Sequence, residues 1–288
     1  MRVRARGVMA ENLSHCAGEV KKHDRDRFLC ALFARLDARE GLFAIYAFNH
    51  EIARIAEAVR EPLAGEIRLQ WWRDAMAGVY AGDPPRHPVA VALSETVRRF
   101  ALSRSYFDRL LDARGTELAG DPPADADALI CYAKGISAPV SWLGLEVLGV
   151  GGDAAFEAAR HVGIAWAITG LVRAIPFHAA RARVYLPAVS RRHGALDVDA
   201  LLRGPPVPGL ADVVSELCEL AAGHLADARR LRAQVPRAAL PVLLPATLAE
   251  GYLGKLRSVR HEPFAAHVRA SAPSRLVLLA LNAFWGRY

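Results

Sequence analysis

The residues best suited to chemistry lie in an arginine-rich segment around positions 173 to 185. Arg173 and Arg183, with Tyr185, could form a pocket for an anion such as a diphosphate or a phospholipid head group. Guanidinium groups suit this task because they donate bidentate hydrogen bonds to phosphate oxygens. The same side chains could instead make structural ion pairs, and the residue types leave both interpretations open.

Two histidines and a glutamate raise the question of a metal site. His50, Glu57 and His178 combine imidazole with carboxylate, a donor set that suits zinc or iron better than magnesium. These residues come from two separate segments, and a lone histidine is more often a structural residue than a ligand. We therefore predict no metal site from these three.

Helices must position these side chains, because apolar residues recur at helical spacing along nearly the whole chain. From Leu210 to Leu231 they follow the i, i+3, i+4, i+7 rule for one buried stripe. Two stretches, Ala38 to Val59 and Ala154 to Phe177, are apolar on more than one face, which favours the centre of a large bundle. The sequence predicts an all-α protein of roughly nine or ten helices.

The length of the chain and the lack of a long linker segment favour a single domain. Nothing between Ser14 and Tyr288 resembles a long linker in this chain of 288 residues, so we expect one domain over residues 14–288 after a flexible tail, residues 1–13. Either Met1 or Met9 could be the start. The tail is basic but lacks the apolar segment of a secretory signal.

The net charge of +7 does not by itself indicate nucleic-acid binding. Counting gives 33 Arg and 4 Lys, and the arginines are spread along the whole length instead of forming a stripe. The 4 cysteines lie far apart without a CxxC pair, so neither a zinc motif nor a disulfide framework is indicated. We predict no nucleic-acid partner and a reducing cytoplasm.

Membrane contact is expected to be peripheral at most. No window reaches the roughly 18 uninterrupted apolar residues that a spanning helix needs. The segment from Leu276 to Tyr288 is apolar and basic, and such a surface could touch a membrane. The predicted location is cytoplasmic, with contact at the inner membrane as its closest approach to a bilayer.

Three motifs in the chain resemble those of the squalene/phytoene synthase family. The segment from Ala167 to Pro187 resembles the family's second signature, in which a TNxxRDxxED helix runs into an arginine-rich turn closed by Arg, Tyr, Leu and Pro. Leu42 to Val59 resembles the YAFCRxxDDxxDE helix, and Arg68 to Leu93 resembles the LxxWWRD helix and its following loop. The resemblance implies the all-α isoprenoid synthase bundle, with a central cavity that opens at a diphosphate-binding mouth.

The resemblance also implies a chemistry whose metal ligands are missing here. In that family two prenyl diphosphates are joined after one ionises, and Mg²⁺ held by aspartates neutralises the leaving group. At the six positions where the family carries or flanks these acids, this chain has Ala53, Arg54, Glu57, Ala174, Phe177 and His178. Pro176 in the second signature also requires that helix to bend or end.

Site roles follow from the resemblance only residue by residue. Tyr46, Glu57 and Tyr185 are the candidates to line a reacting cavity, and none is identified as catalytic. Arg173, Arg183 and His50 are the candidates for a diphosphate or other anion. No cofactor is expected, and Mg²⁺ enters only if the chain is an active synthase.

Two functions remain open at this point. The eroded acidic motifs resemble a divergent branch of the family, the assembly factors of respiratory complex I, which implies a non-catalytic or weakly catalytic pseudoenzyme. Its partners would be complex I subunits or assembly factors, together with a bound prenyl diphosphate or lipid. The alternative is an active head-to-head prenyltransferase of isoprenoid biosynthesis that acts on farnesyl or geranylgeranyl diphosphate.

Overall fold

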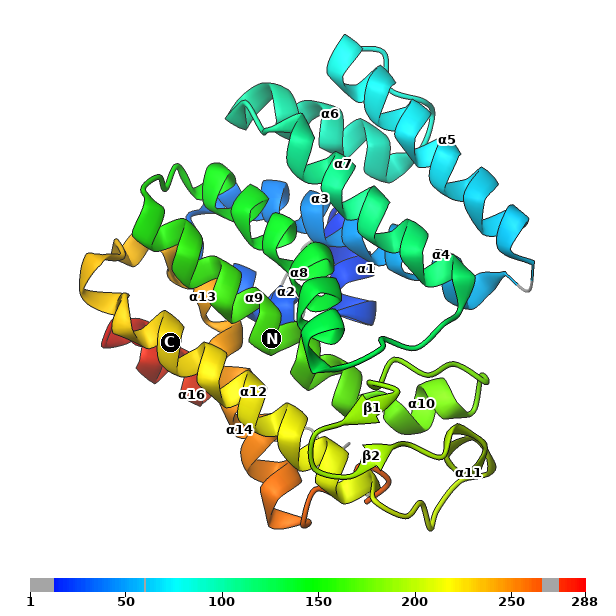
Figure 1. The fold of residues 1–288 in the computed structure, drawn as a ribbon. Coiled ribbons are helices and arrows are strands. Elements are labelled where there is room, and N and C mark those ends of the chain that lie inside the picture. The colour runs from blue at the N-terminus through cyan, green and yellow to red at the C-terminus, as the bar shows by residue number, and fades with distance from the viewer. Residues whose placement is uncertain (1–12, 60, 266–274) are drawn as a thin grey trace, which may run out of the picture.

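The computed structural model describes residues 13–59, 61–265 and 275–288, and nearly all regular structure within them is helical (Figure 1). In chain order the helices of the first half are α1 (His15–His23), α2 (Arg25–Ala31), α3 (Leu36–Ala53), α4 (Ile55–Ala58), α5 (Pro62–Ala81), α6 (Pro88–Phe100) and α7 (Arg104–Gly115). They are followed by α8 (Ala126–Leu148), α9 (Asp153–Arg173), α10 (Ile175–Ala179), α11 (Val198–Arg203), α12 (Leu210–Arg230), α13 (Leu240–Leu243), α14 (Pro245–Ser258) and α16 (Arg275–Phe284). The predicted all-α class is confirmed.

Short non-α elements connect the helices. Turns of 3-10 helix lie at Thr116–Ala119, Arg232–Gln234 and Arg237–Ala239. One antiparallel hairpin, β1 (Val189–Ser190) with β2 (Gly194–Ala195), follows α10 and pairs Val189 with Ala195. This hairpin could not be predicted, because strands of two residues are too short to show alternation.

The centre of the bundle is formed by α8 and α9. Helix α9 packs most extensively against α8 and α12, with α5 to α7 on one side of this centre and α12, α14 and α16 on the other (Figure 1). The predicted stripe of α12 is confirmed, since its apolar side chains from Leu210 to Leu225 are largely buried. Among the described helices, α8 alone is long and apolar enough to cross a membrane, but its buried side chains belong to the core.

Both of the central apolar stretches break within the family signatures. The first is α3, which ends at Ala53 and continues after Arg54 as the single turn α4. The second is α9, which ends at Arg173 and continues after Ala174 as α10. Pro176 explains the second break, because its ring and missing N–H are incompatible with a continuous helix. These breaks give more helices in the described part of the chain than the nine or ten predicted.

Residues near both ends of the described chain make polar contacts with the helices of the core. Asp26 in α2 accepts a hydrogen bond from Tyr252 of α14 at 2.6 Å and pairs with Arg275 at the start of α16. The hydroxyl of Tyr288 donates to the backbone carbonyl of Ala228 in α12 at 3.0 Å. Residues more than 200 positions apart therefore share one buried polar contact.

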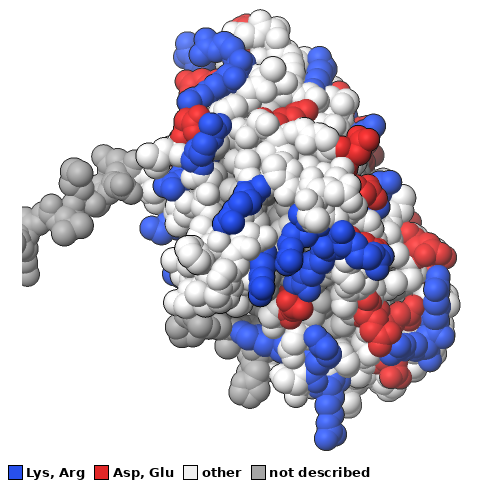
Figure 2. Space-filling view, turned by 90° about the vertical axis from the view of Figure 1, so that its left-hand side faces the viewer, with Lys and Arg blue, Asp and Glu red and all other residues white. Residues whose placement is uncertain are grey.

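Charge is distributed over the surface. On the face shown in Figure 2, Lys and Arg side chains are interleaved with Asp and Glu, with several basic groups near the middle of the view. The formal charge of +7 is therefore not collected into one uninterrupted basic stripe on this face.

Candidate functional site

A cavity of about 210 Å³ lies where the broken ends of the two signature helices meet. Ala53 and Glu57 line it from α3 and α4, while Gly170 and His178 line it from α9 and α10. Helix α8 closes a further side with Tyr132. The fold therefore brings the two signature segments together around one cavity.

The cavity does not continue as a deep apolar tunnel. Beyond Arg27 a second space is lined by Tyr46, Gly163 and Val242, and its volume is only about 10 Å³. That is about the space of one water molecule. Tyr46 is buried, with the guanidinium of Arg27 5.5 Å from its ring centroid, and burial raises the pKa of its hydroxyl. Side chains thus fill the depth of the bundle at this point.

An ion pair without net charge forms one wall of the cavity. Arg114 donates to the buried carboxylate of Glu117 at 2.6 Å, and the hydroxyl of Tyr132 donates to the same carboxylate at 2.9 Å. Although burial alone would lower it, the pKa of Arg114 is raised by Glu117. Burial first and then Glu117 raise the pKa of Tyr132. These residues hold one another, and their charges cancel.

The degenerate metal positions have different surroundings. Ala53 offers the cavity only a methyl group, and Glu57 lies at the exposed rim, where partial burial raises the pKa of its carboxyl group. Arg54 is exposed and lies 3.9 Å from Glu51, and it lines another depression with Trp71. Glu57 is therefore the one acid of the first signature that reaches this cavity among the described residues.

The second signature contributes no carboxylate. His178 lines the cavity beside Tyr185, with their ring centroids 4.7 Å apart. Burial, with help from Arg181 and Arg183, lowers the pKa of His178 to about 4, so this imidazole is neutral at pH 7. Phe177 is exposed under the guanidinium of Arg181, and Ala174 forms the helix break.

The three anion candidates lie in three environments. Arg183 donates to the backbone carbonyls of Ala56 at 2.6 Å and Glu117 at 3.4 Å, and it lines an adjoining cavity of about 190 Å³. Tyr185 lines both cavities, and burial raises the pKa of its hydroxyl to about 12. Arg183 and Tyr185 are thus the pair from the arginine-rich segment that the fold brings together.

Arg173 and His50 lie elsewhere. The guanidinium of Arg173 stacks 3.4 Å from the ring centroid of Tyr252, which links it to the contact between the chain ends. His50 stacks on His23 with ring centroids 4.3 Å apart, beside Glu19. The proposed donor set of His50, Glu57 and His178 is therefore divided between two places.

The residues that dominate the cavity wall could not be predicted from the sequence. Arg114 and Glu117 are three positions apart, a spacing that permits an ion pair on one helical turn but does not say that it is buried. Tyr132, which donates to the same carboxylate, lies on a different helix, α8. Burial in this wall depends on how α7 packs against α8, which a single sequence does not reveal.

Similarity to known proteins agrees with this geometry. The family model described as squalene/phytoene synthase matches residues 20–276. The chain belongs to the squalene/phytoene synthase family. Among solved structures in this family, the squalene synthase HpnC from Alicyclobacillus acidocaldarius superposes with a TM-score of 0.74, covering 86% of this chain and 94% of that one at 20% sequence identity.

Within the squalene/phytoene synthase family, the curated relatives divide by name. The NADH dehydrogenase (ubiquinone) complex I assembly factor 6 of Bos taurus is 33% identical over 251 residues, 87% of this chain and 75% of the relative. The presqualene diphosphate synthase of Rhodopseudomonas palustris is 27% identical over 246 residues, 84% of this chain and 86% of the relative. The chain is more similar to the assembly factor than to this synthase.

Proposed function

We propose that this chain is a non-catalytic member of its family that serves in the assembly of respiratory NADH dehydrogenase. The observation that carries the proposal is the wall of the cavity. Ala53 and Gly170 stand where the two signature helices approach, and the buried carboxylate of Glu117 is already bonded to Arg114 and Tyr132. The greater similarity to the bovine assembly factor supports the same function.

The donor set does not fit magnesium. Mg²⁺ requires near-octahedral oxygen ligands, and prenyl diphosphate chemistry would need carboxylates from both helices. Of the two carboxylates that line the cavity, Glu117 is neutralised and Glu57 stands alone at the rim. The charges of Arg27 and Arg114 are balanced by those of Glu57 and Glu117. A diphosphate leaving group would therefore not find the metal ligands that its departure requires.

The size of the cavity supports the same conclusion. Pockets for small ligands usually occupy about 300 to 1,000 Å³. The cavity of about 210 Å³ lies below that range, and the space beyond it near Tyr46 is closed to about 10 Å³. Two prenyl chains would have to displace the side chains that fill the bundle.

A product assay tests the non-catalytic part of the proposal. Purified protein is incubated with farnesyl or geranylgeranyl diphosphate and Mg²⁺, with a presqualene diphosphate synthase as the positive control. We expect no C30 or C40 product and no diphosphate release above the blank without protein. Turnover that Glu57→Gln and Arg173→Ala abolish would overturn the proposal in favour of the active prenyltransferase.

A genetic assay tests the assembly part. In the organism that encodes the chain, deletion of its gene should reduce assembled NADH dehydrogenase in the membrane, measured by native gels and NADH oxidation. Plasmid copies of the wild type and of Glu57→Gln should restore it equally, because the proposed role uses no carboxylate chemistry. Normal complex levels in the deletion strain would contradict the proposal.

Partner and ligand contacts are further parts of the proposal. Helix α16 exposes the apolar side chains of Leu276, Val277, Leu281 and Phe284, which would suit a peripheral contact with a membrane or a membrane-arm subunit. The cavity beside Arg183, with a volume of about 190 Å³, would hold only the head group of a prenyl diphosphate or lipid. Liposome flotation and diphosphate titration measure these two contacts separately, and Phe284→Ser and Arg183→Ala should weaken one each.

A further inference from the structure

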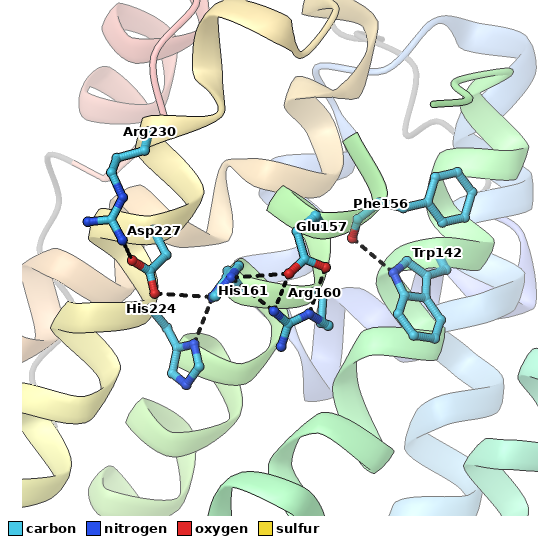
Figure 3. Close-up of polar contacts among 8 residues, drawn as sticks. All are labelled: Trp142, Phe156, Glu157, Arg160, His161, His224, Asp227 and Arg230. Atoms are coloured by element: carbon cyan, nitrogen blue, oxygen red, sulfur yellow. Dashed lines mark hydrogen bonds and ion pairs between the residues drawn. The ribbon is translucent and has the colours of Figure 1, made fainter. Parts of the chain in front are cut away.

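A second polar cluster lies between α9 and α12 (Figure 3). His224 and Asp227 are three residues apart on α12, a spacing that puts both side chains on one face of that helix. His161 of α9 points toward them, with its Nδ1 2.8 Å from Nδ1 of His224 and 3.8 Å from Oδ2 of Asp227. All three candidate ligand atoms lie within 4.8 Å of one another.

These separations are close to those of a metal site. Two imidazole nitrogens and a carboxylate oxygen bind zinc at about 2.0 to 2.2 Å, so tetrahedral ligand atoms lie roughly 3.3 Å apart. The observed 2.8 and 3.8 Å fall on either side of that distance. Small rotations of the His161 and His224 rings would make the three atoms converge on one point.

Neighbouring residues orient the side chains of Asp227 and His161. Arg230 donates to Oδ1 of Asp227, which leaves Oδ2 facing His161 (Figure 3). The far nitrogen of His161, Nε2, lies 3.5 Å from Oε1 of Glu157. Metal-bound histidines commonly donate this second N–H to a carboxylate, which fixes the ring orientation. Glu157 is placed to accept that hydrogen.

We propose that His161, His224 and Asp227 form a binding site for a divalent transition metal of the zinc class. Nδ1 of each histidine and Oδ2 of Asp227 are the ligands, and water completes the coordination. Imidazole with one carboxylate favours zinc over magnesium or calcium, which prefer oxygen ligands alone.

Without a metal, the cluster is satisfied by hydrogen bonds. Arg160 lies 3.0 Å from Nε2 of His161 and can donate to it, so the ring hydrogen resides on Nδ1 and is shared with His224. When the metal binds Nδ1, that hydrogen moves to Nε2 and is donated to Glu157, with no net release of protons.

The site is separate from the proposed function of the cavity. His161 precedes Gly170 by nine residues on α9, which is about 13 Å along the axis and two and a half turns, so the two lie on opposite faces of that helix. The cluster is open to solvent, since the side chain of Asp227 is 34% exposed. Metal and water can therefore reach it without passing through the bundle.

The other candidate group is arranged less well. Glu19, His23 and His50 also lie within reach of one another, but the rings of His23 and His50 are stacked with only 15° between their planes. Nitrogen lone pairs lie in the ring planes, so in stacked rings they run alongside each other and do not converge. His50→Ala is therefore the matched control for a histidine lost outside the proposed site.

Metal titration of the whole chain tests the proposal. Chelator-treated protein is titrated with Zn²⁺ by calorimetry, and with Co²⁺, whose visible spectrum reports tetrahedral coordination. We expect one equivalent of Zn²⁺, a raised melting temperature with Zn²⁺, and a tetrahedral Co²⁺ spectrum. His224→Ala should lose all three, Asp227→Asn should bind at least tenfold more weakly, and His50→Ala should bind like the wild type.

Several results would overturn the proposal. They are the absence of a Zn²⁺ equivalent in the wild type, binding by His224→Ala and Asp227→Asn that equals the wild type, or a loss in His50→Ala instead. Circular dichroism confirms that each variant is folded. If His224→Ala does not fold, the near-isosteric and partly exposed Asp227→Asn decides the outcome alone.

Discussion

The two ends of helix α9 have opposite relations to the family pattern. At its C-terminal end the fold of a squalene/phytoene synthase is kept, but Ala174, where the helix breaks, stands at a position where the family has an acidic ligand. Nearer its N-terminal end, outside the family signatures, His161 meets two metal-binding side chains of α12. Helix α9 thus contributes no carboxylate to the cavity, but it contributes His161 to the cluster with His224 and Asp227. The scaffold is retained independently of the chemistry placed on it.

The largest effect on stability is expected when the ion pair in the cavity wall is disrupted. Arg114→Met leaves the Glu117 carboxylate buried without its cation, so we expect a loss of about 3 to 5 kcal/mol in the free energy of unfolding. Urea denaturation measures it. Adding Glu117→Gln removes the unpaired charge and should recover most of the loss. A stable single variant would mean that Arg114 is poised for a ligand and is not structural.

Acidification should lower the stability of the folded protein, because it protonates His178. The pKa of His178 is lowered to about 4 in the folded protein, while the unfolded chain takes up this proton near its ordinary value of about 6.5. Stability is therefore lost as pH falls from about 6.5 to about 4, by roughly 3 kcal/mol at most. His178→Gln should flatten this part of the stability curve. Parallel curves for His178→Gln and the wild type would contradict the assignment.

Alanine substitutions at two glycines of α9, Gly163 and Gly170, test how closely this helix is packed at each position. A Cβ at Gly163 would meet the α8 backbone at Ser137 at 3.3 Å, whereas a Cβ at Gly170 would meet nothing within 4 Å. Overpacking costs about 1 to 3 kcal/mol, and alanine in a helix gains about 1 kcal/mol over glycine. We expect Gly163→Ala to destabilise by about 1 kcal/mol and Gly170→Ala to stabilise by up to that amount. Thermal unfolding of the pair measures the difference, and equal shifts would refute it.

The smallest effect is expected at the edge of the metal cluster. Arg230 is 74% exposed, so Arg230→Ala should change stability by less than about 1 kcal/mol. Because Arg230 orients Asp227, zinc affinity should fall even though stability does not. Arg230→Lys serves as the control that keeps the charge. Unchanged zinc affinity in Arg230→Ala would show that Asp227 needs no such support.

The fold could be predicted from the sequence where local rules decide. The apolar stripe of α12 and the helix break near Pro176 follow from spacing and from the geometry of proline, and both are confirmed. The break at Arg54 carries no proline signal, and nothing in the contacts of that residue explains it. The hairpin at Val189 was too short to detect.

The site was predictable only in part. The missing aspartates are visible in the sequence, and the fold places Ala53 and Glu57 at the cavity. The stacking of Arg173 on Tyr252 was not visible, because it depends on how α9 packs against α14. The pairing of His161 with His224, 63 residues later, has the same origin. Spacing within one helix can be read from a sequence, whereas contacts between helices require the fold.

The shared contact of Asp26 with Tyr252 and Arg275 has a consequence for biosynthesis. These partners are 226 and 249 residues apart, so the nascent chain cannot complete this contact until α16 has left the ribosome. Until then Asp26 lacks the guanidinium of Arg275. Late closure between such distant segments is slow, because long-range contacts form after their loop entropy is lost. We expect chains that stall before Arg275 to remain open and to depend on chaperones or fall to proteolysis.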